Sequence, residues 1–424
     1  MKKSSVPTTP PVEFAAFVGF DWSDQKHDVR LLVAGQTKAE SLVLPNTPEQ
    51  FHPWVESLRK RFAGRPVAVA FEAHRGALVH MLRGYDFLHL FPINPKSAAR
   101  FREAFFPGGA KTDPLDVDLI LELLLKHRDR LVPLRSDTPE TRLLGLLSEQ
   151  RRTLVDQRTA LVNELGAALK AYFPQGIELG GGDLTRPLAW DFLRRWPSLA
   201  AAQKAGAETL RKFYYAHHSR SEEAIRARLD RLAKAQALSA DPVLLEASIF
   251  HVRSLVRQLA AAQAGVDGYD ARLRELLDAH PDAGIFRSLP GAGAVLAARL
   301  LAALGTDRER WADAAELQIV TGVAPVIVSS GTSRRVLNRW VRPRFLHQTF
   351  VEFAKCSLPL CEWAHTLYDA LKLRGRNHWT AVRTVAFRWL RIIFRCWKNR
   401  TPYDEVTYLA ALKKHGSPHL PKPA

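Results

Sequence analysis

The sequence predicts a mixed α/β region in the first third of the chain and an all-α region in the remainder. Short apolar runs typical of strands alternate with amphipathic helical segments up to about residue 135. Beyond residue 136 the strand signals stop, and apolar residues recur at helical spacing. A chain of 424 residues is too long for one hydrophobic core, so we expect several domains.

The α/β region begins with three strand-like runs in succession. FAAFVGFD (14–21), HDVRLLVAG (27–35) and ESLVLP (40–45) have turn residues between them, which indicates an antiparallel meander. Then follow a helix (47–62), a strand (66–73), a helix (76–85), a strand (87–94), a short helix and a longer helix (114–127). This βββαβαβα order is that of an RNase H-like domain, a mixed sheet with helices on both faces.

Two long helical segments dominate the middle of the chain. Apolar residues recur every seven positions in the first, and in steps of three and four in the second. The first set is Leu147, Leu154, Leu161 and Ala168, and the second is Val252, Leu255, Leu259, Ala262, Val266, Tyr269, Leu273 and Leu276. The pattern predicts a coiled-coil seam, which is either intramolecular or between subunits. Polar helical sequence separates the two segments, so we interpret the region as a helical spacer.

These patterns predict five consecutive regions. We expect a disordered tail (1–12), the RNase H-like domain (13–135), the helical coiled-coil spacer (136–281), a basic and mainly helical C-terminal domain (282–414) and a second disordered tail (415–424). The sequence SLPGAG (288–293) resembles the hairpin of a helix-hairpin-helix element, but an ordinary turn between core helices explains it equally well. No apolar run is long enough to span a bilayer and no signal peptide is visible, so we expect a cytoplasmic protein.

Positive charge is the strongest compositional signal. The chain has 61 Lys and Arg against 43 Asp and Glu, a formal net charge of +18. Residues 317–400 alone have 15 basic against 3 acidic residues, and aromatic residues are interleaved with the arginines. Among these aromatic residues are Trp340, Phe345, Trp363, Trp379, Trp389 and Trp397. Basic groups that pair with phosphates and aromatic rings that stack on bases together favour a nucleic-acid partner over an anionic membrane.

Four acidic residues occupy positions that converge in an RNase H-like fold. Asp21 and Glu72 end predicted strands, while Asp113 and Asp116 open the helix after the last strand. In TDPLD, Asp113 can cap the helix and Asp116 lies three residues on, so both face one way. Asp118 is an alternative, but it lies about 200° around the helix from Asp116.

Converging carboxylates need a positive neighbour. Two like charges about 4 Å apart repel by roughly 4 kcal/mol at an effective dielectric constant near 20. Oxygen ligands without histidine or cysteine suit Mg²⁺ or Mn²⁺, and two such ions can bind the attacking and leaving oxygens of a phosphodiester. Each acid alone is explained as well by a turn, a cap or a surface charge, whereas the four together favour a metal site.

The motifs GFDWSDQKHDV (19–29), FEAHRG (71–76) and GGAKTDPLDVDLI (108–120) resemble the N-terminal motifs of the DEDD transposases of bacterial insertion sequences. SLPGAGAVLAARLLAALG (288–305) and TGVAPVIVSSG (321–331) are similar to the C-terminal domain of that family. The resemblance thus covers both ends of the chain. It implies a recombinase that acts on double-stranded DNA at element ends and target under the direction of a structured non-coding RNA. It also implies a homo-oligomer in which the acidic and serine-bearing domains share composite active sites.

The resemblance also implies roles for particular residues. Asp21, Glu72, Asp113 and Asp116 correspond to the family's RuvC-like metal-binding tetrad, and Ser330 corresponds to its nucleophilic serine, with Ser329 as the second choice. Without the resemblance, a serine before a glycine is more often a turn residue. Basic residues near these motifs are candidate nucleic-acid contacts, namely Lys111, Arg334, Arg335, Arg339, Arg342 and Arg344.

Two other functions fit part of the same sequence. A metal-dependent junction nuclease would need only the acids, because water would attack the phosphodiester. A nucleic-acid-binding architectural protein would need only the basic region and would tolerate loss of the acids. The transposase interpretation accounts for both ends of the chain, and we expect such an enzyme to associate with the nucleoid.

Overall fold

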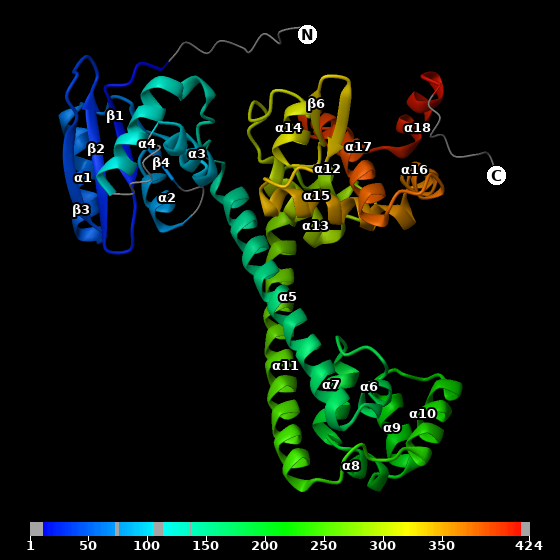
Figure 1. Cartoon of the computed structure of the whole chain (residues 1–424). Helices are drawn as coiled ribbons and strands as arrows, with labels where there is room; N and C mark the ends of the chain where they lie inside the picture. Colours follow the sequence, from blue (N-terminus) through cyan, green and yellow to red (C-terminus); the bar gives the residue numbers. More distant parts are fainter. Residues whose placement is uncertain (1–11, 73–75, 106–112, 136, 417–424) are drawn as a thin grey trace. The chain divides into compact units, whose positions relative to one another are not determined.

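The computed structural model describes residues 12–72, 76–105, 113–135 and 137–416, whose course is drawn in Figure 1. The chain divides into two compact units, Met1–Ser136 and Asp137–Ala424. The first is α/β and the second is mainly helical, which confirms the predicted fold class. None of the helices in the described ranges combines the length and apolar composition needed to cross a membrane.

A five-stranded mixed sheet forms the centre of the first unit. Its strands are β1 (Ala16–Asp21), β2 (Lys26–Val33), β3 (Glu40–Pro45), β4 (Val67–Phe71) and β5 (Leu88–Pro92), in the order β3-β2-β1-β4-β5. The pairs β1–β2 and β2–β3 are antiparallel, whereas β1–β4 and β4–β5 are parallel. Every residue of β4 is buried, which explains its uninterrupted apolar sequence.

Helices cover both faces of this sheet. They are α1 (Pro48–Arg61), α2 (Ala77–Leu82), α3 (Pro95–Phe105) and α4 (Asp113–His127). One core cluster joins Phe20 of β1 to Phe51 of α1, and the other joins Ala70 of β4 to Leu124 of α4. At Gly19 of β1, a side-chain Cβ would lie only 2.8 Å from the carbonyl oxygen of Val117. The absence of a side chain at Gly19 therefore lets α4 lie directly on β1.

Two long helices, α5 (Pro139–Tyr172) and α11 (Pro242–Asp278), run antiparallel through the second unit (Figure 1). The guanidinium of Arg151 on α5 pairs with Asp270 on α11, and that of Arg158 donates to Gln263. Most of the heptad residues predicted on α11 are buried within the chain, namely Val252, Leu255, Leu259, Ala262, Val266 and Leu273. Leu154 of α5 packs directly on Gly265 of α11. The apolar seam of α11 is thus covered within one polypeptide.

The segment between these helices in the sequence forms a small helical layer, whose core also includes residues of α5 and α11. It contains α6 (Gln175–Leu179), α7 (Pro187–Arg195), α8 (Leu199–Lys204), α9 (Ala207–Ala216) and α10 (Glu222–Lys234). Two buried tyrosines fasten it, because the Tyr172 hydroxyl donates to the Pro197 carbonyl (2.6 Å) and the Tyr214 hydroxyl to the Leu179 carbonyl (2.8 Å). Burial raises the pKa of both hydroxyls, that of Tyr214 to about 12, so both stay protonated donors.

Seven further helices build the C-terminal part of the second unit. They are α12 (Ala283–Arg287), α13 (Gly293–Leu304), α14 (Ala314–Val320), α15 (Arg344–Ser357), α16 (Glu362–Leu373), α17 (His378–Asn399) and α18 (Glu405–Lys414). Trp363, Trp389 and Trp397 are fully buried in their core. The expectation that these three tryptophans stack on bases is therefore wrong, because their rings have no solvent-exposed face. Trp340 and Trp379 are exposed.

The SLPGAG turn, residues 288–293, packs into this core as well. A Cβ on Gly291 would lie 2.4 Å from the Cys356 carbonyl oxygen at the end of α15. Gly291 also has φ +79°, a conformation that favours glycine. The Ser288 hydroxyl accepts a hydrogen bond from the Tyr403 amide (2.7 Å). The close backbone approach at Gly291 is thus to protein, as expected for a turn between core helices.

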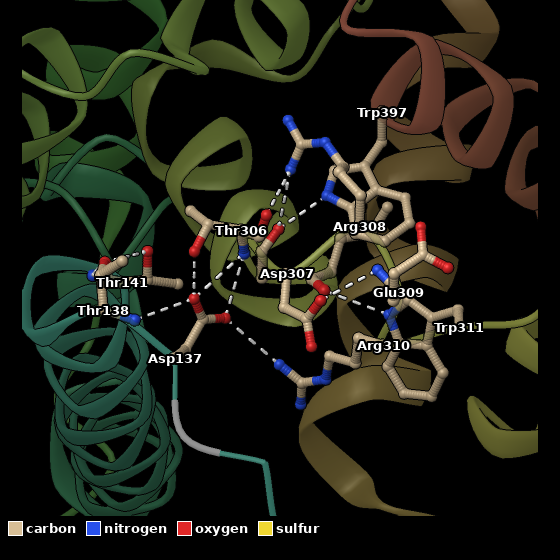
Figure 2. Close-up of polar contacts among 12 residues, drawn as sticks. Asp137, Thr138, Thr141, Thr306, Asp307, Arg308, Glu309, Arg310, Trp311 and Trp397 are labelled. Carbon is tan, nitrogen blue, oxygen red and sulfur yellow. Dashed lines mark hydrogen bonds and ion pairs between the residues drawn. The ribbon is translucent and has the colours of Figure 1, made fainter. Parts of the chain in front are cut away.

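Figure 2 shows how the start of α5 is joined to the loop after α13. The Asp137 carboxylate accepts hydrogen bonds from the Thr306 amide (3.1 Å) and the Thr306 hydroxyl, and Nη1 of Arg310 lies 3.4 Å from its Oδ2. Gly305, with φ +79°, makes room for this carboxylate, because a Cβ there would overlap Oδ2. One buried acid therefore fixes the point at which the chain enters the second unit.

Candidate active site and nucleic-acid interface

The sheet of the first unit brings two of the predicted acids to the same edge. Asp21 is the last residue of β1, and Glu72 directly follows β4. The two strands are parallel neighbours, and Phe20 pairs with Phe71, so Asp21 and Glu72 occupy equivalent positions one residue further on. Carboxyl ends of adjacent parallel strands are where α/β folds bind their ligands.

Asp116 joins this pair from α4. Asp21, Glu72 and Asp116 line one pocket of about 350 Å³. Asp116 lies one turn into α4 and is 7% exposed, and the packing of α4 on Gly19 sets its height above the sheet edge. Asp113 is the first residue of α4, but its side chain lies outside the described part of the structure. Three of the four predicted acids therefore share a pocket.

The pocket contains a further carboxylate that is not one of the four predicted acids. Asp28 on β2 lies opposite Asp21 in the antiparallel register and lines the same pocket. Asp28 could have been predicted only from the pairing of β1 with β2, because their register is what brings Asp28 and Asp21 together. Asp118, the alternative considered on α4, instead accepts a hydrogen bond from Nε of Arg30 at 2.7 Å. Its orientation agrees with its position on the opposite side of the helix.

Two cations also line this pocket, Lys26 and Arg102. Nη2 of Arg102 on α3 lies 2.7 Å from Oδ1 of Asp116. The guanidinium does not point its hydrogen at this oxygen, and Oδ1 accepts no hydrogen bond from the described residues. We regard the contact as an ion pair of poor hydrogen-bonding geometry. Asp116 therefore keeps a buried oxygen with unused capacity for a ligand.

The donor set fits a hard divalent cation in its chemistry. All three described members of the tetrad offer carboxylate oxygens, which Mg²⁺ and Mn²⁺ prefer. In the described part of the chain, however, no three His, Cys, Asp or Glu side chains lie close enough to hold one ion together. The carboxylates lie around a common space without forming a closed cage.

The predicted nucleophile lies in the second unit on a hairpin that the sequence argument missed. β6 (Val326–Ser330) and β7 (Ser333–Leu337) pair antiparallel, and all their residues except Val326 are exposed. Gly331, with φ +55°, is the first residue of the two-residue loop, as in a type II′ turn. Neither face of the hairpin is covered, so its strands lack the alternation of apolar and polar residues that identifies a strand in sequence.

The register of the hairpin separates the two candidate serines. Ser330 pairs with Ser333, and Ser329 pairs with Arg334. Because successive side chains of a strand point to opposite faces, Ser330 shares a face with Arg335, and Ser329 shares the other with Arg334. Each candidate serine therefore has an arginine on its own face.

The remaining predicted contacts have different surroundings. Arg339 and Arg342 line a pocket of about 620 Å³ at the base of the hairpin. Arg344 begins α15, is highly exposed, and pairs with Asp156 of α5 at 3.1 Å. Lys111 lies outside the described residues. The structure thus gathers two of these side chains at one site.

Comparison with known proteins gives matches to both ends of the chain. A family model described as a transposase matches residues 18–174, and the model of the transposase IS116/IS110/IS902 family matches residues 283–369. Together they cover more than half of the chain. The first match includes Asp21, Glu72, Asp113 and Asp116, and the second includes the β6–β7 hairpin.

Several relatives come from insertion elements, and two of them match over almost their whole length. The mini-circle putative transposase for IS117 of Streptomyces coelicolor is 27% identical over 93% of this chain and 97% of its own length. The 43.6 kDa protein of insertion element IS110 from the same organism is 26% identical over 92% and 96%. The 42 kDa protein of insertion element IS900 of Mycobacterium paratuberculosis is 27% identical over 72% and 76%. With both family models matched in order along one chain of matching length, this protein belongs to the IS116/IS110/IS902 family of transposases.

Proposed function

We propose that this transposase cleaves and rejoins DNA strands with Ser330 as the nucleophile and with divalent metal held by Asp21, Glu72, Asp113 and Asp116. The observation that carries the acidic half of the proposal is the shared pocket at the carboxyl ends of β1 and β4. Asp28 lines the same pocket and adds a fifth candidate ligand.

The metal part of the proposal rests on the buried oxygen of Asp116. Oδ1 accepts no hydrogen bond of good geometry from the described residues, and its charged neighbour is the Arg102 guanidinium at 2.7 Å, so it keeps capacity for a further ligand. Mg²⁺ or Mn²⁺ bound there would polarise the phosphodiester and stabilise negative charge on the attacking and leaving oxygens. The four carboxylates would hold the ion, and the Arg102 guanidinium balances part of their negative charge.

The serine part of the proposal assigns a covalent step. The Ser330 oxygen forms a bond to phosphorus, the bond from phosphorus to one sugar oxygen breaks, and the hydroxyl proton is lost as the leaving sugar oxygen gains one. A phosphoserine link then joins protein and DNA, and attack by a sugar hydroxyl reverses the step and reseals the strand. Two observations support this assignment. Ser330 is exposed beside the turn, and Arg335 lies on the same face of the hairpin, where its guanidinium could bind a phosphate oxygen.

The test is to trap the covalent intermediate on labelled element-end DNA with Mg²⁺ present. We expect a denaturant-resistant adduct with the wild type and with Ser329→Ala, and none with Ser330→Ala or Asp21→Asn. An adduct that survives Ser330→Ala would refute the serine role. Cleavage without any adduct would instead identify the water-using junction nuclease. Full recombination after Asp113→Asn without divalent ions would favour the architectural protein.

We further propose that a structured non-coding RNA directs this enzyme, that it works as a homo-oligomer, and that it acts on the nucleoid in the cytoplasm. The positive charge of residues 317–400 supports a nucleic-acid partner. Sequencing of RNA that copurifies with the protein tests the guide, with an enriched structured species as the expected result. Light scattering tests the assembly, and a monomer at working concentration in the presence of DNA would contradict it.

A further inference from the structure

A pocket at the base of the β6–β7 hairpin contains an unusual concentration of arginines. Its volume is about 620 Å³, and it is bounded by β7, the loop from β7 to α15 and the N-terminal turns of α17. In Figure 1 these elements all belong to the yellow and orange part of the second unit. Four guanidinium groups line it, those of Arg339, Arg342, Arg376 and Arg383.

Among the described residues that line this pocket, none is acidic. None of its four arginines forms an ion pair with a carboxylate within the ranges that the structure describes. Two largely buried arginines elsewhere in the same unit do have such partners: Arg299 lies 2.5 Å from Glu352, and Arg308 lies 2.7 Å from Asp282. The pocket instead gathers four guanidinium groups without a counter-charge among the described residues.

The electrostatic cost of this arrangement is visible in the neighbouring groups. Burial and the positive charge of Arg342 lower the pKa of Arg383. Burial, together with the charges of Arg342 and Arg383, lowers the pKa of His347 to about 4. His347 is therefore neutral at physiological pH. The chain tolerates several repelling cations at one place, which is the usual condition of a site that binds an anion.

The positions of these cations are fixed by packing. Gly322 has φ +70°, and a Cβ there would lie 2.4 Å from Cβ of Arg342, so the arginine stem lies directly on the glycine. The Thr380 hydroxyl accepts a hydrogen bond from Nη2 of Arg383 at 3.1 Å. Thr380 also lies in the first turn of the 22-residue helix α17, whose N-terminal end adds positive potential. The site is thus partly organised before any ligand arrives.

The walls of the pocket indicate what kind of anion fits. Val336, Leu371 and Phe387 provide an apolar lining beside the guanidinium groups. A nucleotide presents this combination, since its phosphate is anionic and its sugar is largely apolar. Arginine pairs with two phosphate oxygens at once, which favours phosphate over a single point charge. The pocket also adjoins β7, whose exposed Arg334 and Arg335 extend the positive surface along the hairpin.

We propose that this arginine pocket, formed by Arg339, Arg342, Arg376 and Arg383, binds a backbone phosphodiester of the DNA substrate and so holds the hairpin against the strand. The inference rests on the proposed DNA-cleaving function, and it adds Arg376 and Arg383 as phosphate ligands. Both come from the α16–α17 part of the fold, outside the motif that carries Ser330. The pocket acts in binding and is separate from the bond-breaking step.

The test measures binding of the full-length protein to a fluorescein-labelled duplex DNA by anisotropy over a range of salt concentrations. We expect Arg376→Gln and Arg383→Gln each to weaken binding about tenfold. Each should also reduce the slope of log affinity against log salt by about 0.9. Arg374→Gln is the matched control, because it removes an exposed arginine in the same loop that does not line the pocket.

The possible outcomes are distinguishable. Equal binding by the pocket variants and by Arg374→Gln overturns the proposal, as does a loss seen only with an RNA of the same sequence. Because Arg376 is exposed, its variant tests binding even if Arg383→Gln disturbs folding, and thermal unfolding checks both. Binding does not depend on chemistry. If the wild type forms the adduct at Ser330 and the pocket variants bind DNA as tightly as the wild type, only the pocket proposal is rejected. If the pocket variants bind DNA more weakly but the wild type forms no adduct, only the serine mechanism is rejected.

Discussion

Nη2 of Arg102 lies 2.7 Å from Oδ1 of Asp116, and this ion pair stands at the pocket where three predicted metal ligands meet. On sequence grounds, a metal ion alone was expected to neutralise these acids. The structure adds a resident cation, whose charge offsets part of the repulsion among the carboxylates. Any incoming divalent ion must therefore compete with, or displace, the Arg102 guanidinium.

This competition predicts opposite effects for the two partners. Arg102→Gln should raise Mn²⁺ affinity about threefold to tenfold, because it removes a positive charge from the site. Asp116→Asn should lower it by about tenfold or more, because it removes a ligand. Calorimetric Mn²⁺ titration measures both. Asp118→Asn serves as the control, since Asp118 pairs with Arg30 outside the pocket. Identical affinities in all four proteins would rule out ion binding at this edge.

The hairpin register predicts that two adjacent arginines differ in importance. Arg335 shares the face of Ser330, whereas Arg334 lies on the face of Ser329. If Ser330 is the nucleophile, Arg335→Gln should slow adduct formation about tenfold or more, and Arg334→Gln should do so less. Single-turnover rates on saturating DNA separate this effect from binding. A larger effect of Arg334→Gln would indicate that Ser329, and not Ser330, is the nucleophile.

Asp137 is predicted to be a stability determinant without a role in chemistry. Its nearly buried carboxylate accepts hydrogen bonds from the amide and hydroxyl of Thr306 (Figure 2). Asp137→Ala should lower the free energy of unfolding by about 2 to 4 kcal/mol, because it leaves the Thr306 amide and hydroxyl without their acceptor. Urea unfolding measures the loss. Asp241→Ala removes an exposed helix cap and should cost only about 1 kcal/mol; an equal loss in both would contradict the argument.

His347 predicts a pH dependence of stability. Its pKa is about 4 in the folded protein against 6.5 for the free side chain, so the unfolded state binds the proton more readily. The contribution of neutral His347 to the free energy of unfolding is therefore complete above about pH 6.5 and is lost as the pH falls toward about 4. His347→Gln should make the decline of the urea midpoint between about pH 7 and pH 5 shallower. If the pH profiles of the two proteins superimpose, the folded protein does not lower the pKa of His347.

The sequence by itself determined the order of strands and helices in the first unit. Local apolar patterns were sufficient to predict these elements, because the buried strand β4 is a continuous apolar run and each helix has an apolar face. Asp21 and Glu72 could be placed on one edge because parallel strands end together. The family motifs supplied the transposase assignment, which the comparisons then established.

Only the tertiary structure decided the features that depend on which surfaces meet. A heptad pattern is the same whether its partner lies in the same chain or another, and α5 covers the seam of α11 within this chain. Trp363, Trp389 and Trp397 are core residues rather than a stacking surface, a choice that composition cannot make. Asp28, Arg102 and the four-arginine pocket involve side chains from separate elements, so their meeting is set by strand register and helix packing and not by spacing along the sequence.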